Sequence, residues 1–172
     1  MQIVIRRAAT EDAAALSELA ARIFFDTFVP YNTPEDMDAF LASSYTEARQ
    51  RSEIADPSIT TLLATCDGAL AGYAQVQEGA APACVTGPAP IQLKRLYVDK
   101  SLHGKGVAQR LMDEVENVAR QRGARTLWLG VWEQNDRALA FYGKYGFRPV
   151  GEEDFHVGVD RQTDLVLERA LH

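Results

Sequence analysis

Residue types that hold metals and disulfides are scarce in this chain. Its 172 residues include two cysteines and three histidines. Cys66 and Cys84 form no C-x-x-C pair, and His103, His156 and His172 are scattered along the sequence. This spacing argues against a disulfide framework and offers no set of metal ligands. We therefore expect both thiols to be reduced and structural, and we expect no metal.

Long apolar runs are also missing. No run approaches the roughly 20 residues that a membrane-spanning helix needs, and the opening residues MQIVIRR lack the order of a signal peptide. We expect a cytoplasmic protein with no membrane partner. A chain of 172 residues with 47% hydrophobic and 24% charged residues suits one globular domain that covers residues 1–172.

Acidic residues outnumber basic ones, but not evenly along the chain. The formal net charge is −6. Residues 94–125 contain eight Lys and Arg against four Asp and Glu, a charge of +4, which leaves −10 for the rest of the chain. A basic segment suits a ligand that carries phosphates, whereas the acidic remainder disfavours nucleic acid and favours a cationic partner. Solvated faces with no partner account equally well for most of these charges.

One stretch organises the chain. Ile91–Val98 is an apolar-rich run that predicts a strand, and after a short polar turn comes His103–Ala108, which contains two glycines. Apolar residues then recur with helical spacing at Val107, Leu111, Val115 and Val118. We expect a helix over 104–122. The first N–H groups of a helix lack intrahelical partners and attract negative charge, so the loop predicts an anion site.

Two common phosphate loops do not match this segment. A P-loop requires Ser or Thr after its lysine, but Gly106 follows Lys105, and a dinucleotide fingerprint counted from the first glycine requires glycine at Gln109. The segment instead resembles R/Q-x-x-G-x-G/A, the pyrophosphate loop of the GNAT acyl-CoA N-acetyltransferases. Gly106 and Ala108 fill its last two positions, and His103 stands at the first in place of Arg or Gln. On this loop alone, an ordinary strand-to-helix connection is an equal alternative.

A second stretch carries the same resemblance. Leu127–Val150 contains the spacing N-x-x-A-x-x-x-Y-x-x-x-GF, which is typical of the C-terminal motif of that family. Its positions are filled by Asn135, Ala138, Tyr142 and Gly146-Phe147. Seven residues separate Asn135 from Tyr142, so both are expected on one helical face. Because the two motifs occur in the family's order, the chain is identified as resembling a GNAT N-acetyltransferase over about residues 3–168.

The resemblance implies an α/β (α+β) fold, with a mixed, strongly twisted sheet of about six to seven strands flanked by helices. In this fold the central strands splay apart after the loop and admit the pantetheine arm. Asp67-Gly68 predicts a hairpin turn between two of the strands. Strands are expected over 3–5, 59–65, 70–77, 91–98, 126–131, 147–150 and 165–167, and helices over about 10–28, 33–44, 46–55, 104–122 and 135–145.

The resemblance also implies that acetyl-CoA is the acyl donor. Backbone N–H groups near Leu96–Val98, where a bulge parts the strands, are expected to hold the oxyanion, and those of the loop to hold the pyrophosphate. Lys105 is expected to screen phosphate charge, although a solvated lysine is the alternative. Lys144 is expected to reach the adenosine phosphate. The implied cofactor-binding residues are Leu96, Tyr97, Val98, His103, Gly104, Lys105, Gly106, Val107, Ala108, Asn135, Ala138, Tyr142 and Lys144.

Acetyl transfer to an amine needs a base as well as an acid. An alkylammonium with a pKa of about 10.4 must lose a proton before or during its attack on the thioester. In the family, a tyrosine at the position of Tyr142 often protonates the departing thiolate, and a core tyrosine is the alternative. Ile91–Val98 carries no carboxylate, so Glu133, which follows the adjacent strand, is the expected base. Its alternatives are to orient the amine or to face solvent.

The acceptor is expected to be a small cationic amine. In the family the segment between the first two helices commonly forms one wall of the acceptor site, which indicates Tyr31 and Asn32 as substrate-binding residues. The carboxylates Asp26, Glu35 and Asp36 are expected near Tyr31, with Glu133 and the acidic run Glu152-Glu153-Asp154 opposite. Phe155–Asp164 resembles F-x-x-G-x-D-x-Q-T-D, the ending of the bacterial spermidine/spermine acetyltransferase branch. A turn that joins two strands explains Gln162–Asp164 as well. A polyamine such as spermidine or spermine is therefore the first candidate acceptor.

Other functions fit the same motifs. The acceptor could be a protein N-terminus or lysine, an amino acid or an antibiotic. Outside enzymes, the alternative is a protein that binds CoA as a sensor without turnover. Tyr142 argues against the sensor, and His103 mildly favours it. The sequence leaves the oligomeric state open, a homodimer included.

Overall fold

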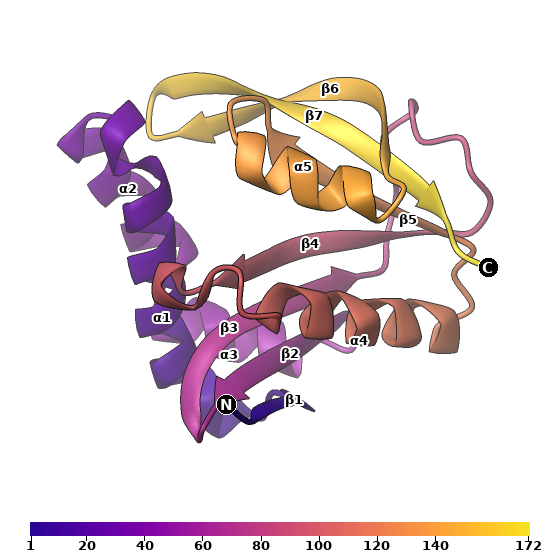
Figure 1. Ribbon diagram of the computed structural model, residues 1–172. Coiled ribbons are helices and arrows are strands. Elements are labelled where there is room, and N and C mark those ends of the chain that lie inside the picture. The colour runs from indigo at the N-terminus through magenta and orange to yellow at the C-terminus, as the bar shows by residue number, and fades with distance from the viewer.

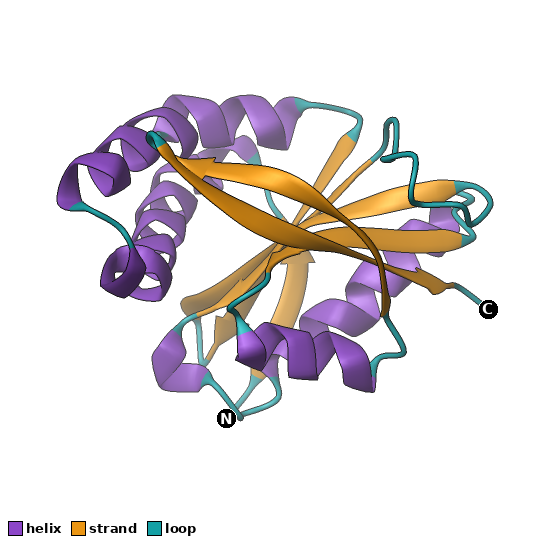
Figure 2. Cartoon of the chain, turned by 90° about the horizontal axis from the view of Figure 1, so that it is seen from above, coloured by secondary structure: helices purple, strands orange, loops and turns teal.

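Seven strands form one mixed sheet in the computed structural model, which describes all residues from Met1 to His172 (Figure 1). The strands are β1 (Ile3–Arg7), β2 (Ile59–Cys66), β3 (Ala69–Gln77), β4 (Pro90–Val98), β5 (Thr126–Trp132), β6 (Arg148–Val157) and β7 (Asp160–Ala170). They lie in the order β1-β2-β3-β4-β5-β7-β6, and every adjacent pair is antiparallel except β4 and β5. The expected mixed sheet is confirmed, and Figure 2 shows its strong twist.

Five α-helices flank this sheet. They are α1 (Ala13–Phe28), α2 (Pro34–Ser44), α3 (Glu47–Ala55), α4 (Val107–Gln121) and α5 (Asp136–Lys144). In Figure 1, α4 and α5 lie in front of the sheet and α1 and α3 lie behind it. No helix combines the length and the apolar character that crossing a membrane requires.

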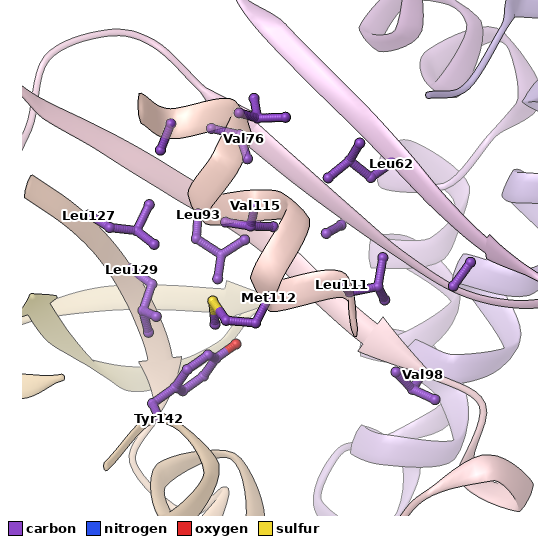
Figure 3. Close-up of a cluster of buried hydrophobic side chains, with 14 of the residues drawn as sticks. Leu62, Val76, Leu93, Val98, Leu111, Met112, Val115, Leu127, Leu129 and Tyr142 are labelled. Atoms are coloured by element: carbon purple, nitrogen blue, oxygen red, sulfur yellow. The ribbon is translucent and has the colours of Figure 1, made fainter. Parts of the chain in front are cut away.

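The sheet is covered on both faces, so its side chains divide between two cores. Leu62 of β2 joins a cluster of 21 buried residues that includes the apolar face of α4, whereas the next residue, Leu63, joins a cluster of 12 that includes α1. Figure 3 shows part of the first cluster, with Leu111 and Val115 of α4 set against the strands. This alternation explains why nearly all of β2 is buried.

Local turn and capping signals match the structure. Asp67 and Gly68 have φ values of 50° and 85°, the left-handed conformation that a two-residue type I′ hairpin turn requires. The hydroxyls of Thr33 and Thr46 accept hydrogen bonds from backbone N–H groups in the first turns of α2 and α3, so both threonines are N-caps, as expected for α3. Both cysteines are free thiols.

Three elements, α4, β6 and β7, differ from their expected bounds by several residues. α4 begins at Val107 rather than at residue 104, because Gly104 and Gly106 have φ values of 77° and 89°, which no α-helix contains. β6 and β7 are ten and eleven residues long, much longer than the expected strands over 147–150 and 165–167. Their added residues are largely polar and pair with each other across the hairpin, so the apolar alternation that marks a strand is absent.

A buried polar cluster lies between α3 and the centre of the sheet. The Arg95 guanidinium of β4 donates to Glu53 of α3 and to the side-chain oxygen of Gln75 on β3, at 2.7 Å in each case. The Gln75 amide in turn donates to Glu53 at 2.9 Å. Burial alone would raise the pKa of Glu53, but Arg95, Gln75 and Lys94 outweigh it, and the pKa lies below its ordinary value. Glu53 is therefore ionised and neutralises a buried arginine.

Removing this carboxylate should destabilise the fold strongly. Glu53→Ala leaves the Arg95 charge buried without its counter-ion, and we expect the free energy of unfolding to fall by about 3 kcal/mol. Glu47→Ala is the matched control on the same helix, because Glu47 pairs with Arg51 at the exposed surface, and it should change that free energy by less than about 0.5 kcal/mol. Urea unfolding at neutral pH measures both. Equal effects of the two variants would contradict the structural role of Glu53.

Candidate active site

The opening between β4 and β5 creates the site. These parallel strands pair only over Pro90–Gln92 and Thr126–Trp128, and beyond that point they separate. A cleft of about 1020 Å³ occupies the gap. One end is lined by the segment 100–109 and by α5, and the other by α1, β6 and β7. The free edge of β4, including Leu96, Tyr97 and Val98, lines the cleft between them, so its outward N–H groups lack a strand partner.

A bulge in β4 accompanies the separation. Gln75 of β3 pairs with Arg95, but the next residue, Val76, pairs with Leu93, so Lys94 is an extra residue in β4. A bulge bends its strand and increases the local twist, which turns the rest of β4 away from β5. The expected bulge is therefore present, but at Lys94 rather than at Leu96–Val98.

The donor loop, residues 103–109 at the start of α4, presents unpaired N–H groups to one end of the cleft. The N–H groups of Gly104, Gly106, Val107, Ala108 and Gln109 donate to no backbone carbonyl. Gly106, whose left-handed φ is favourable only for glycine, aims the loop at the cleft, and nothing lies within 4 Å of the position that a Cβ would occupy there. Converging N–H groups at a helix N-terminus bind anions.

His103 has a structural contact in this loop. Its Nε2 lies 2.9 Å from the Val98 carbonyl oxygen. A carbonyl only accepts, so Nε2 is the donor and the ring ties the loop to the end of β4.

Three cations line the cleft. They are Lys100, which precedes the loop, and Arg137 and Lys144, both on α5. Lys105 does not line the cleft, and its side chain is exposed. Lys144 and Lys105 were predicted from the sequence, whereas Lys100 and Arg137 were not, because only the folded positions of the 3₁₀ turn Lys100–Leu102 and of α5 bring them to the cleft.

Asn135 and Tyr142 are held by α5. The Asn135 side-chain oxygen accepts from the Ala138 N–H at 3.2 Å and caps the helix, which leaves its amide N–H₂ group for another partner. Tyr142 is 7% exposed, and burial raises its pKa well above the ordinary value. Figure 3 shows its side chain reaching from α5 toward Met112 of α4. Asn135, Ala138 and Tyr142 all line the cleft.

Aromatic side chains form the opposite end of the cleft. Phe24 and Phe28 of α1, Phe40, Tyr45, Trp132 and Phe155 line it, and several are in mutual ring contact. The sequence-predicted acceptor residues are arranged differently. Tyr31 is 57% exposed and packs edge-on against Trp132, with ring centroids 4.8 Å apart. Asn32 donates to the Phe28 carbonyl and accepts from Gln162, so it anchors the β6–β7 hairpin.

Glu133 is also outside the cleft. Glu133 is exposed to solvent, and it does not line the cleft between β4 and β5. Thus Tyr31, Asn32 and Glu133, the three residues predicted to bind the acceptor, do not line the cleft, whereas Asp26, which was expected near Tyr31, does.

Two carboxylates of the β6–β7 hairpin do line the cleft, and one of them, Glu153, belongs to the acidic run Glu152-Glu153-Asp154 that was expected near the acceptor. Glu153 of β6 and Asp164 of β7 face each other as a cross-strand pair. Burial and then the neighbouring Glu153 raise the pKa of Asp164 to about 7, and burial raises the pKa of Glu153 as well. Their positions depend on the register of a hairpin whose polar residues gave no strand signal, so the sequence could not have paired them.

Comparison with known proteins identifies the family. The model of the acetyltransferase (GNAT) family matches residues 14–147. An uncharacterised N-acetyltransferase of Lactobacillus delbrueckii subsp. lactis is 33% identical over 169 residues, which is 98% of each chain. The chain belongs to the GNAT acetyltransferase family. It is accordingly an N-acetyltransferase, and the expected family, fold and enzyme class are confirmed.

Two comparisons are with proteins of Thermoplasma acidophilum. The first is the PaiA N-acetyltransferase, whose crystal structure was solved in complex with coenzyme A. Its sequence is 25% identical to this chain, the match covers 99% of both chains, and the TM-score is 0.80. The spermidine N(1)-acetyltransferase of that organism is 26% identical over 152 residues, which is 86% of this chain and 89% of the relative.

Two glycines at opposite ends of α4 test the donor loop. Gly106→Ala introduces a methyl group beside the free N–H groups and disfavours the left-handed φ that aims them, so we expect CoA to bind at least about tenfold more weakly, a loss of about 1.4 kcal/mol. Gly123→Ala is the matched control, because Gly123 has a φ of 79° and equally open surroundings but follows the far end of the helix. Calorimetric titration with CoA measures both variants. Equal affinities in two folded variants would contradict the role of the loop.

Proposed function

We propose that this GNAT enzyme transfers the acetyl group of acetyl-CoA to a primary amine of a small molecule, and that the acceptor is a polyamine such as spermidine. The observation that carries the proposal is the cleft itself. It runs past the free edge of β4, with N–H donors and cations at one end and a carboxylate pair among aromatic rings at the other.

The donor end fits acetyl-CoA. The free N–H groups of the segment 104–109 would hold the pyrophosphate, with Lys100, Arg137 and Lys144 as further partners for its phosphates. The free amide of Asn135 would bond to the pantetheine arm. Acetyl-CoA supplies the thioester, and the outward N–H groups of Leu96–Val98 would stabilise negative charge on its carbonyl oxygen.

Tyr142 suits the role of acid for the departing sulfur. An ordinary phenol, with a pKa of about 10, is already protonated at neutral pH, and burial raises the pKa of Tyr142 further. Tyr97 of β4 lines the same cleft as Tyr142, Glu153 and Asp164. The acid candidate and the cleft carboxylates therefore border one space.

The acceptor end suits an amine with several charges. Glu153, Asp164 and Asp26 of α1 line the cleft, so three carboxylates are available for ammonium groups. Aromatic rings between them provide surfaces on which methylene chains and cations both pack favourably. In this arrangement Tyr31 would act by supporting Trp132, and the similarity to a spermidine acetyltransferase favours the same acceptor class.

Removing the Tyr142 hydroxyl should slow acetyl transfer without weakening the binding of CoA. Tyr142→Phe keeps the buried ring, and we expect kcat to fall about 10²-fold, the scale of general acid catalysis, with little change in the affinity for CoA. Tyr73→Phe is the control, because Tyr73 is also buried, its hydroxyl has no hydrogen-bond partner and it does not line the cleft. Rates of CoA release measure both. Undiminished turnover in Tyr142→Phe would assign the acid to another group.

A panel of amines tests the acceptor. We expect kcat/KM for spermidine and spermine to exceed that of a monoamine of similar length by about tenfold or more, because a second ammonium adds a charge pair worth about 1 kcal/mol or more in a partly buried site. Salt should reduce the preference through screening. Efficient acetylation of a peptide, an amino acid or an aminoglycoside, with polyamines inert, would replace the polyamine proposal. CoA binding without release for every amine would favour the sensor.

A further inference from the structure

We propose that Asp164 is the base that removes a proton from the acceptor amine, and that Glu153, its cross-strand neighbour, tunes it. The inference rests on the proposed function, because it names the base of that reaction. Glu133, the base expected from the sequence, is exposed outside the cleft, so the reaction lacks a base unless another group supplies one.

The geometry brings both carboxylates to the same point of the opening. A Cβ on Gly130 of β5 would lie 2.8 Å from a Glu153 carboxylate oxygen and 3.3 Å from a carboxylate oxygen of Asp164. Both groups therefore cover the backbone of β5 where it has already separated from β4, and Gly130 itself lines the cleft. The absence of a side chain at residue 130 is what lets the pair approach β5.

The surroundings of Asp164 provide no partner for its charge. One carboxylate oxygen, Oδ1, is buried and accepts no hydrogen bond. Among titratable groups, Glu153 of β6 faces Asp164 across the hairpin, and Tyr97 of β4 lines the same cleft. The nearest cations on β4, Lys94 and Arg95, are paired with Glu53 on α3. Burial and Glu153 therefore act together, and the resulting pKa of about 7 is suited to accepting a proton at neutral pH.

A purely structural role does not explain this arrangement. Asp164 is partly buried, its Oδ1 is buried without a hydrogen-bond donor, and a carboxylate in such a position beside a second carboxylate opposes folding when it is ionised. The same hairpin carries Asp154, which is half exposed and paired with Arg161. The difference between Asp154 and Asp164 indicates that the unfavourable environment is confined to the carboxylate that borders the cleft. Such an environment is typical of a functional site.

Asp164, Tyr142 and solvent together complete the proton balance. Asp164 takes the first proton from the ammonium, and the neutral nitrogen forms a bond to the thioester carbon while the carbon–sulfur bond breaks. The nitrogen loses its second proton as the amide forms. Tyr142 gives its proton to the departing sulfur, and the second amine proton restores the tyrosine. Asp164 releases the first proton to solvent, so each turnover yields an amide, free CoA and one proton.

Turnover as a function of pH tests the base. In Asp164→Asn we expect kcat to fall about 10²-fold or more with an alkylamine, whereas Asp154→Asn, on the same hairpin, should behave like the wild type. In Glu153→Gln we expect activity to persist, with the rising limb of kcat/KM moved to lower pH by about one unit, because a like charge is removed. A primary amine whose conjugate acid has a pKa of about 6 is already neutral and needs no base. With that amine the deficit of Asp164→Asn should shrink, which loss of structure would not produce.

Stability as a function of pH is a readout independent of activity. Because the pKa of Asp164 is higher in the folded chain than in the unfolded chain, the wild type should lose stability as pH rises from about 4 to 7. Asp164→Asn cannot ionise, so its Tm should exceed that of the wild type by a few degrees at pH 8 and by little at pH 5.

Several results would overturn the proposal. These are full turnover of Asp164→Asn with an alkylamine, loss of turnover in Glu133→Gln alone, and an unmoved pH limb in Glu153→Gln. If the wild type released CoA with no amine, the proposed function would fail and Asp164 would have no such role. A difference in Tm between Asp164→Asn and the wild type that is independent of pH would, separately, refute the raised proton affinity of the pair.

Discussion

The separation of β4 from β5 is the constraint on which the rest of the structure depends. Three residue pairs join these strands before the bulge at Lys94 turns β4 away. Backbone groups inside a sheet normally pair, and those on the free edge of β4 remain available for a ligand. Each element that follows is placed by this divergence, because the donor loop continues from β4, α5 continues from β5, and the β6–β7 hairpin projects its carboxylates over Gly130.

Contacts between distant parts of the chain hold this opening in shape. Arg95, beside the bulge, is fixed to α3 through Glu53, so the bent part of β4 is anchored on the side away from the donor loop. The tip of the β6–β7 hairpin is fixed to the region after α1, since Gln162 donates to Asn32 and the Val159 N–H donates to Asp36. The two cores on opposite faces of the sheet keep α4 and α1 in place. A site built on these contacts is largely formed before any ligand binds.

The two ends of the cleft differ in charge, which would orient the two substrates of the proposed reaction. Free N–H groups and cations attract a phosphate-bearing donor, whereas Asp164, Glu153 and Asp26 attract an ammonium. In the proposed reaction, the reacting groups would meet in the cleft between Tyr142, whose pKa is raised by burial, and Asp164, whose pKa is raised by burial and by the neighbouring Glu153. Opposite roles thus arise from similar burial acting on a phenol and on a carboxylate.

The sequence by itself determined the family and the order of the elements, and it predicted residues on the donor side that line the cleft. Those features depend on short-range patterns, such as the glycine spacing at Gly104 and Gly106, the seven-residue interval from Asn135 to Tyr142 and the turn at Asp67-Gly68. Only the tertiary structure showed which polar residues line the rest of the cleft. Asn32 holds the β6–β7 hairpin and Tyr31 packs against Trp132, while Glu133 faces solvent. Glu153 and Asp164 are neighbours only because of the register between two largely polar strands. Neither local propensity nor hydrophobic periodicity specifies which polar residues meet across strands, because that choice is made by register and packing over the whole sheet.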